Sequence, residues 1–274
     1  MRMSRYGIVL LVLLAAFMPL PVKANSQETQ IVVAALKQVD RGNISQAKAT
    51  ISRVSSPTAR AVVDWYAYTK GNSGASFQEM SSFVSAHPEW PLLDTIRLEA
   101  EKNMTDGVPN ATLLRWFREN SPITAKSMDR YAQALISQGE AAQARKFLRT
   151  WWPKADLTRD QQKEFYGRYS TYLDRESHVE RLNNLLYRDQ YANAEAMANT
   201  LGGGYPALAA ARQGLARNSG NVNALIAAVP AALQNDEGLL YERLKWRRQN
   251  DLDDGAIEIL NRAPPASKMT NPAD

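Results

Sequence analysis

The chain has 274 residues, a formal charge of +5 at pH 7 and no cysteine. Without cysteine it can form neither a disulfide scaffold nor a cysteine-linked lipid anchor, and zinc fingers and cysteine nucleophiles are excluded as well. Histidine occurs only at His87 and His178, neither with a metal-ligand partner four residues on. We therefore expect no Ser-His-Asp triad and no zinc site, and we predict no cofactor, no metal and no catalytic residue in this chain.

Residues 1–24 have the pattern of a secretory signal. Arg2 and Arg5 precede an apolar run at residues 8–20, and small side chains follow at Val22 and Ala24. The run is shorter than the roughly 20 residues of an ordinary membrane span. We therefore predict cleavage after Ala24, with an uncleaved anchor as the alternative.

Removal of the signal segment lowers the net charge of the chain. The segment contains three cations and no acids, so the remaining chain has 30 Lys and Arg against 28 Asp and Glu. A nearly neutral, exported chain does not suit nucleic-acid binding. Export without cysteine fits the bacterial periplasm. We expect no membrane span after cleavage, because no second apolar run is long enough.

The rest of the chain predicts helices. Segments with apolar residues at i, i+3, i+4 and i+7 alternate with short breakers, and the alternating Val, Ile and Thr of strands is missing. The count predicted in this way is near fourteen helices. The clearest segments are residues 31–39, 92–104, 127–139 and 207–218.

Four of the predicted turns share one pattern, a polar turn followed by a small residue one helical turn later. They begin at Gly42, Gly139, Asp189 and Asn250, with spacings of 97, 50 and 61 residues. The small residues are Ala47, Ala144, Ala194 and Gly255. This pattern is typical of helical hairpins that pack closely, as in tetratricopeptide-like repeats, but the spacing is irregular.

Several residue groups suggest chemistry at first sight, and simpler interpretations are available. Gly202, Gly203 and Gly204 follow no predicted strand, so we interpret them as a helix stop and not as a phosphate loop. The acidic pairs Asp253-Asp254 and Glu99-Glu101 are interpreted as solvated helix faces. Four or five of the six tryptophans are expected to pack between helices, with Trp151-Trp152 before Pro153 closing a helix end.

Three segments, in order, resemble soluble lytic murein transglycosylases. The first, FVSAHPEWPLLDTIRLEAEKNM at residues 83–104, has the Pro-x-Trp-Pro turn and a helix with Arg and Ala-Glu. The second, at residues 113–152, has Trp-Phe, Pro-x-Thr and Leu-x-x-x-Gly. The third, at residues 204–264, has Val-Pro, Asp-x-Gly-Leu, Tyr-Glu-Arg, Trp-Arg-Arg and Gly-Ala. The resemblance covers about 180 residues.

The resemblance implies an all-α fold, a U-shaped superhelical array of irregular tetratricopeptide-like hairpins. It assigns residues 1–24 to the signal peptide, 25–263 to the superhelical domain, and 264–274 to a flexible tail or the start of a linker to a missing catalytic domain. That lysozyme-like domain, which in the family uses one glutamate to leave a 1,6-anhydro end, is not recognisable here. The single Glu-Ser pair, Glu176-Ser177, lacks the context of the catalytic glutamate.

Two functional hypotheses remain open. In the first, the chain is the superhelical region of a periplasmic lytic transglycosylase, which binds or positions peptidoglycan glycan strands, or contacts a separate catalytic protein, without cleaving. In the second, it is a non-catalytic scaffold that recruits cell-wall proteins. Substrate-binding residues are not identified, although Arg243, Arg247 or Arg248 in the basic stretch at residues 239–260 are candidates for contacting acidic murein peptides. The other view of these cations is a solvated helix face.

Overall fold

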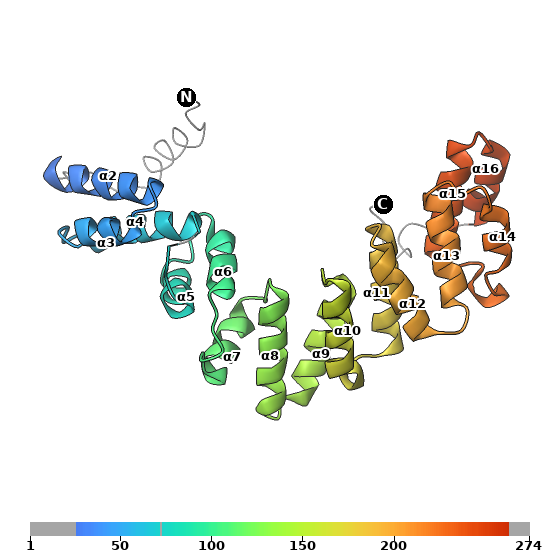
Figure 1. Ribbon diagram of the computed structural model, residues 1–274, viewed down its shortest axis with the longest axis horizontal. Coiled ribbons are helices and arrows are strands. Elements are labelled where there is room, and N and C mark those ends of the chain that lie inside the picture. Colours follow the sequence, from blue (N-terminus) through green and yellow to red (C-terminus); the bar gives the residue numbers. More distant parts are fainter. Residues whose placement is uncertain (1–25, 72, 263–274) are drawn as a thin grey trace. The chain divides into compact units, whose positions relative to one another are not determined.

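The computed structural model describes residues 26–71 and 73–262. Within these ranges the chain forms fifteen α-helices and three short 3-10 helices, and no strand. The predicted all-α class is therefore confirmed (Figure 1). The predicted signal peptide and the tail at residues 264–274 lie outside the described residues.

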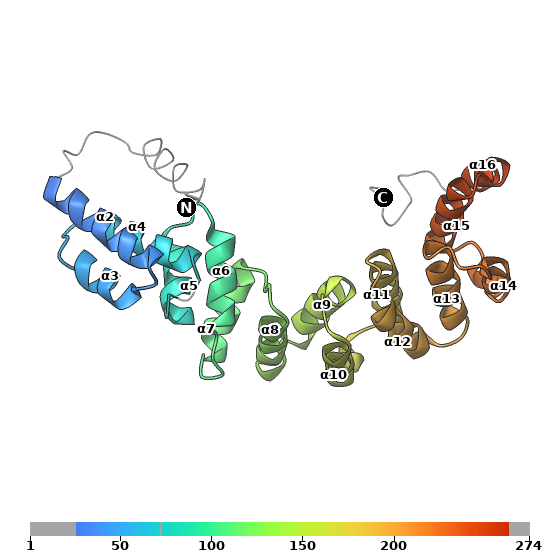
Figure 2. The same cartoon turned by 45° about the horizontal axis from the view of Figure 1, so that its top comes forward.

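The described residues divide into two compact units, one up to Val108 and the other from Pro109 onward. In the first, α2 (Ser26–Asp40) packs on both α3 (Ile44–Ile51) and α4 (Pro57–Thr69), and α5 (Phe77–Ala86) packs on α6 (Leu93–Lys102), as Figure 2 also shows. Small and branched side chains form the core between α2, α3 and α4: Ala35, Val39, Ala47, Ile51, Val54, Val63 and Ala67.

The second unit contains the remaining helices. They are α7 (Asn110–Glu119), α8 (Ala125–Ser137), α9 (Ala141–Trp151), η1 (Trp152–Lys154), α10 (Arg159–Tyr169), η2 (Ser170–Tyr172), α11 (Arg175–Tyr187), α12 (Tyr191–Leu201), α13 (Tyr205–Ala216), α14 (Val222–Ala227), η3 (Ala231–Leu233), α15 (Glu237–Gln249) and α16 (Asp253–Arg262). The larger of its cores extends from α8 to α13 around Trp152, and a smaller one joins α13, α14 and α15.

Side-chain caps set several helix starts. The Ser76 hydroxyl accepts from the Glu79 amide while the Glu79 carboxylate accepts from the Ser76 amide, a capping box that begins α5. Thr158 and Gln161 form the same arrangement at α10. At α4, Ser56 caps the helix and Pro57 occupies the first turn, where no amide is needed.

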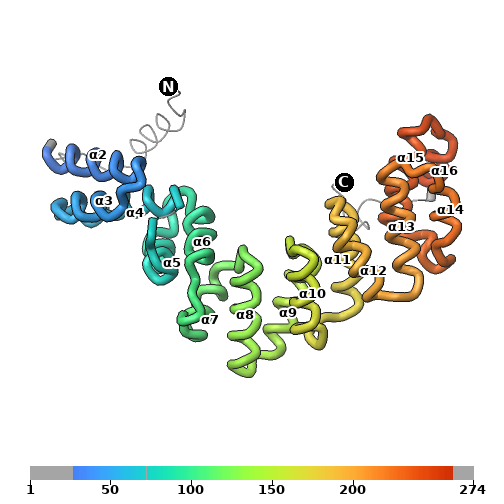
Figure 3. The backbone as a smooth tube through the Cα atoms, viewed as in Figure 1, coloured from blue at the N-terminus to red at the C-terminus, as the bar shows by residue number. Residues whose placement is uncertain are grey.

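The four predicted turns share one backbone geometry. Each contains a residue in the left-handed region, namely Gly42 (φ 78°), Gly139 (75°), Asp189 (57°) or Asp251 (57°). The next amide in each turn donates, over 2.9 Å, to the carbonyl five residues before it; the pairs are Asn43–Gln38, Glu140–Leu135, Gln190–Leu185 and Leu252–Arg247. This bond closes the end of one helix and directs the chain into the next. Figure 3 shows the resulting reversals, and in each case the two flanking helices pack together.

The small residues of three turns are buried as predicted, but the fourth prediction is wrong by one residue. Counting five residues on from the left-handed position gives Ala47, Ala144 and Ala194, all buried. The same count from Asp251 gives Ala256, which is also buried, and not Gly255. The turn starts one residue later than predicted because Asn250 still caps α15. Gly255 instead faces the Arg247 side chain, whose Nη1 a β-carbon there would approach to 2.8 Å.

The tryptophans pack as predicted. Trp65, Trp116 and Trp152 are buried, and the other three are half-buried. Trp65 donates to the Pro91 carbonyl over 2.8 Å and meets the Trp90 ring edge-on at 6.1 Å. At the end of α9, Trp152 is fully buried and stacked on Phe165, with ring centroids 5.7 Å apart. The predicted closure of this helix end is confirmed.

The turn geometry gives a pair of substitutions with opposite effects. No atom lies within 4 Å of a β-carbon at Gly139, so Gly139→Ala adds only left-handed strain, about 1 kcal/mol. We expect its melting temperature to fall by about 2–4 °C. Asp251 is exposed and already strained, so Asp251→Gly should keep or raise the melting temperature. Thermal denaturation followed by circular dichroism measures both; a similar loss in both variants would contradict this account.

Candidate ligand-binding site

Helix α15 contains the cations of the basic stretch, has a capping acid at its start and has a second, buried acid in its middle. The Asp236 carboxylate caps it by accepting from the Leu239 amide over 2.9 Å. Its buried residues are Gly238, Leu239 and Glu242. Leu239 occupies the core with α13 and α14, whereas Leu240 and Leu244 are only half-buried.

A buried arginine holds α15 against α13. The Arg212 guanidinium, 1% exposed, donates to Asn183 Oδ1 over 2.5 Å and lies 3.7 Å from Asp236 Oδ1. It also lies over the Tyr187 ring, 4.8 Å from its centroid. A β-carbon at Gly238 would come within 2.1 Å of its Cζ. Glycine at this position is therefore required for the two helices to approach.

Glu242 lies on the same buried face of α15. Burial raises the pKa of its carboxyl from the usual 4.5, more strongly than Lys245 and Arg212 lower it, and Asp189 adds to the rise. Its Oε2 atom is buried and has no hydrogen-bond partner. Keeping this group ionised in the folded chain is therefore costly.

The cations of α15 divide into two pairs. Lys245 and Arg248 are exposed, as the solvated-face interpretation expects, whereas Arg243 and Arg247 line a pocket of about 270 Å³ together with Trp246. Asn223 and Gln234 also line it, over the apolar side chains of Leu215, Ile226 and Ala227. We call this the α13–α15 pocket.

Hydrogen bonds to neighbouring residues fix three of the side chains that line the α13–α15 pocket. Trp246 Nε1 donates to Asn218 Oδ1 over 2.7 Å, and Arg247 Nη1 donates to the Gly255 carbonyl. Gln234 Nε2 donates to the carbonyls of Ile226 and Val229 over 2.7 and 2.8 Å. An indole, two amides and two guanidinium groups on one pocket suit a polar ring that carries an acidic group.

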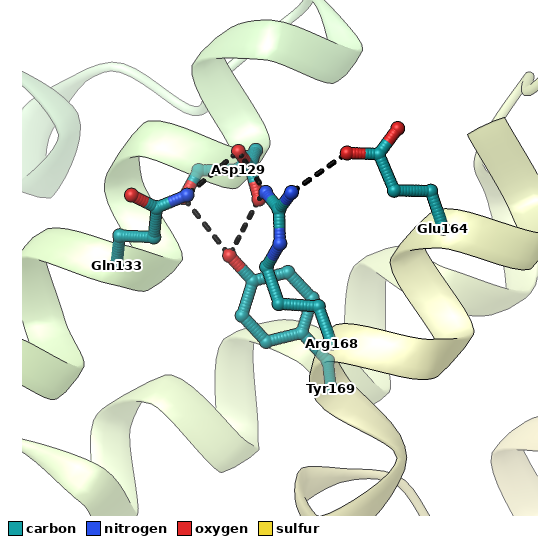
Figure 4. Close-up of polar contacts among 5 residues, drawn as sticks. All are labelled: Asp129, Gln133, Glu164, Arg168 and Tyr169. Carbon is teal, nitrogen blue, oxygen red and sulfur yellow. Dashed lines mark hydrogen bonds and ion pairs between the residues drawn. The ribbon is translucent and has the colours of Figure 1, made fainter.

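Another polar cluster connects α8 to α10 through hydrogen bonds and ion pairs (Figure 4). Asp129 accepts from Arg168 Nη1 at both oxygens over 2.5 Å, from the Tyr169 hydroxyl over 2.6 Å and from Gln133 Nε2 over 2.8 Å. Arg168 also donates to Glu164 over 2.7 Å. Burial and the bond to Asp129 raise the pKa of Tyr169. These hydrogen bonds and ion pairs saturate the Asp129 carboxylate and join α8 to α10.

The structure also places the residues singled out from the sequence. His87 ends α5 between Phe83 and Trp90, and His178 Nδ1 accepts from Trp152 Nε1 over 3.0 Å. Burial lowers the pKa of His178. Glu176 is exposed in the first turn of α11.

The structure also places the glycine run and the two acidic pairs, with one correction. Gly202 and Gly203, both left-handed, end α12, so the helix stop is confirmed. Asp253 and Asp254 open α16 and are exposed. Glu99 forms an ion pair with Lys102 over 2.7 Å, but Glu101 is 0% exposed and its interpretation as solvated is wrong. Glu101 shares the buried face of α6 with Ile96 and Ala100.

Sequence reasoning missed the buried charges Arg181, Arg212 and Glu242. A signal was present for Glu242, since it lies three residues after Leu239 and four before Trp246, on the stripe that α15 buries. The adjacent cations made α15 look polar all round and obscured that stripe.

Within residues 26–71 and 73–262, no helix has the length and apolar character to cross a membrane, and no three His, Cys, Asp or Glu side chains are grouped to hold a metal ion. Comparisons with protein-family models, with curated proteins and with solved structures find no match to this chain.

The raised pKa of Glu242 gives a pH-dependent prediction. A group whose pKa is raised by folding contributes stability at low pH that is lost as the pH rises from 4.5 through the folded pKa. We expect Glu242→Gln to be more stable than wild type at pH 8, with the gain shrinking to nothing below pH 4.5. Urea denaturation across this range measures the difference, and a gain independent of pH would contradict the assignment.

Proposed function

We propose that this chain is the superhelical region of a periplasmic lytic murein transglycosylase and that it binds murein without cleaving it. The recurrent hairpin turns support a stacked, superhelical arrangement, because each of these hairpins buries a small residue at the same position. The three ordered segments of resemblance support the family assignment.

The observation that carries the binding proposal is the α13–α15 pocket. It lies within the third segment of resemblance, at residues 204–264, and its lining includes Trp246, Arg243 and Arg247. Sugar rings pack their apolar faces against aromatic side chains, and guanidinium groups pair with carboxylates. Murein presents both sugar rings and carboxylates, so this lining matches it better than it matches a neutral sugar.

The proposal that the chain does not cleave murein rests on its carboxylates. Glu176 is exposed, and the buried Glu242 does not line the α13–α15 pocket. Asp129 is paired with Arg168 and does not line this pocket either. A general acid must reach the glycosidic oxygen of the bound strand, and none of these three groups lines the pocket.

A second candidate, the scaffold that recruits cell-wall proteins, is favoured by the outer face of α16. Ile257 and Leu260 are 54% and 55% exposed there, one turn apart. In the other hairpins of this kind the residue equivalent to Leu260 is buried: Ile51, Leu148 and Ala198. An apolar partner surface suits this face.

Binding is tested with two arginines of the same helix. We expect Arg243→Gln to weaken co-sedimentation with purified murein sacculi about tenfold, the effect of losing about 1.4 kcal/mol, and Trp246→Ala to do the same. Arg248→Gln is the matched control, because Arg248 is exposed and does not line the pocket. Equal losses for both arginine variants would reduce the effect to net charge and overturn the pocket's role.

Cleavage is tested on the same sacculi. We expect no release of 1,6-anhydro muropeptides by the wild-type chain, and no change with Glu176→Gln. Mass spectrometry of the soluble products makes the measurement. Anhydro products that disappear in a carboxylate variant would show that the chain carries its own catalytic acid.

A further inference from the structure

Arg181 of α11 is a fully buried cation that forms no ion pair with any carboxylate in the described part of the chain. It is 0% exposed. Its Nε donates to Gln162 Oε1 over 3.0 Å, and its Nη1 donates to the carbonyls of Trp152 and Ala155 over 2.6 and 3.0 Å. Its Nη2 is buried without a partner. Burial lowers the pKa of this guanidinium to about 10, so it remains charged at neutral pH. The hydrogen bonds to this buried charge come from neutral acceptors, and Asp156 favours the charge only through space, so keeping the charge buried is costly.

The surroundings of Arg181 are rigidly built. Gln162 Nε2 donates to the Asn193 carbonyl over 3.0 Å, and Asn193 Nδ2 donates to the Leu157 carbonyl over 2.7 Å. The Trp152 ring lies under the guanidinium, 4.2 Å from its centroid to Cζ. This network joins η1, α10, α11 and α12 and fixes the position of the charge.

A pocket of about 410 Å³ adjoins this charge. Its lining includes Trp152 and Gln162, the two side chains in contact with Arg181, with Tyr166 and Met197 as further apolar or aromatic surface. Arg159 and Lys163 stand exposed at its rim and form no ion pair among the described side chains. Asp160 is the one acid in the lining. We call this the α10–α12 pocket.

Three cations therefore surround a pocket with one acid. Two are at the rim and the third is buried behind the wall, where the low dielectric leaves its field poorly screened. The interior is apolar and aromatic. An anion with a small apolar body would bury that body against Tyr166 and Met197 and place its charge near Arg159 and Lys163.

We propose that the α10–α12 pocket binds a carboxylate carried on a small apolar body. The site is separate from the α13–α15 pocket and shares no lining residue with it. The identity of the natural ligand rests on the proposed function. In murein the carboxylate belongs either to a stem peptide or to the lactyl group of a glycan strand whose peptides have been removed.

The test compares N-acetylalanine with its uncharged methyl ester by NMR titration of the full chain labelled with ¹⁵N. The acid should shift amide resonances of η1, α10 and α12, and the ester should not. The double variant Arg159→Gln with Lys163→Gln should weaken binding of the acid at least about fivefold. Arg115→Gln, an exposed cation on α7, is the matched control and should leave binding unchanged. Equal shifts by acid and ester, or none by either, would overturn the proposal.

Two further ligands separate this inference from the proposed function. A free stem peptide and a peptide-free glycan strand are titrated in the same way, and the one that competes with N-acetylalanine identifies the source. If N-acetylalanine binds at the pocket but the chain does not co-sediment with sacculi, the proposed function fails and the carboxylate site stands. If the chain binds sacculi and the double variant binds N-acetylalanine as well as wild type, the carboxylate site fails and murein binding stands.

Discussion

The middle of the larger unit depends on one interaction, the placement of the Arg181 guanidinium among neutral acceptors. Four elements meet at this side chain or at its direct partners, and Trp152, the largest side chain of the unit's main core, lies against it. A charge in this position costs stability unless something offsets the cost. Three hydrogen bonds and an aromatic face offset part of it, and an anion in the adjacent pocket would offset more. Stability and ligand binding are thus linked through the same residue.

Much of the fold follows from local rules that the sequence displays. The left-handed residues at Gly42 and Gly139 are recognisable because glycine tolerates that conformation. Asp189 and Asp251 occupy the same position, and the buried alanine five residues later makes the shared pattern visible despite its irregular spacing. The misplacement of one turn at Asn250 and Gly255 shows the limit of this reasoning: a helix end is set by its last hydrogen bond, and a sequence pattern locates it only to within a residue.

The candidate sites were harder to predict from the sequence than the fold. Tertiary contacts between distant residues decide which of several similar charges is buried. Arg243 and Arg248 look alike in the sequence, yet one lines a pocket and the other is exposed. Arg181 and Arg212 gave no local signal, because their partners are 19 or more residues away. Glu101 likewise became buried through the packing of α6 and not through its own neighbours.

The central proposal is that this helical chain contacts murein through pockets of its larger unit. Hydrogen–deuterium exchange of the full chain, with and without soluble murein fragments, tests this most directly. We predict slower exchange in α10, α12 and α15, which carry lining residues of the two pockets. Protection confined to residues 26–108, or no protection anywhere at saturating fragment, would contradict it.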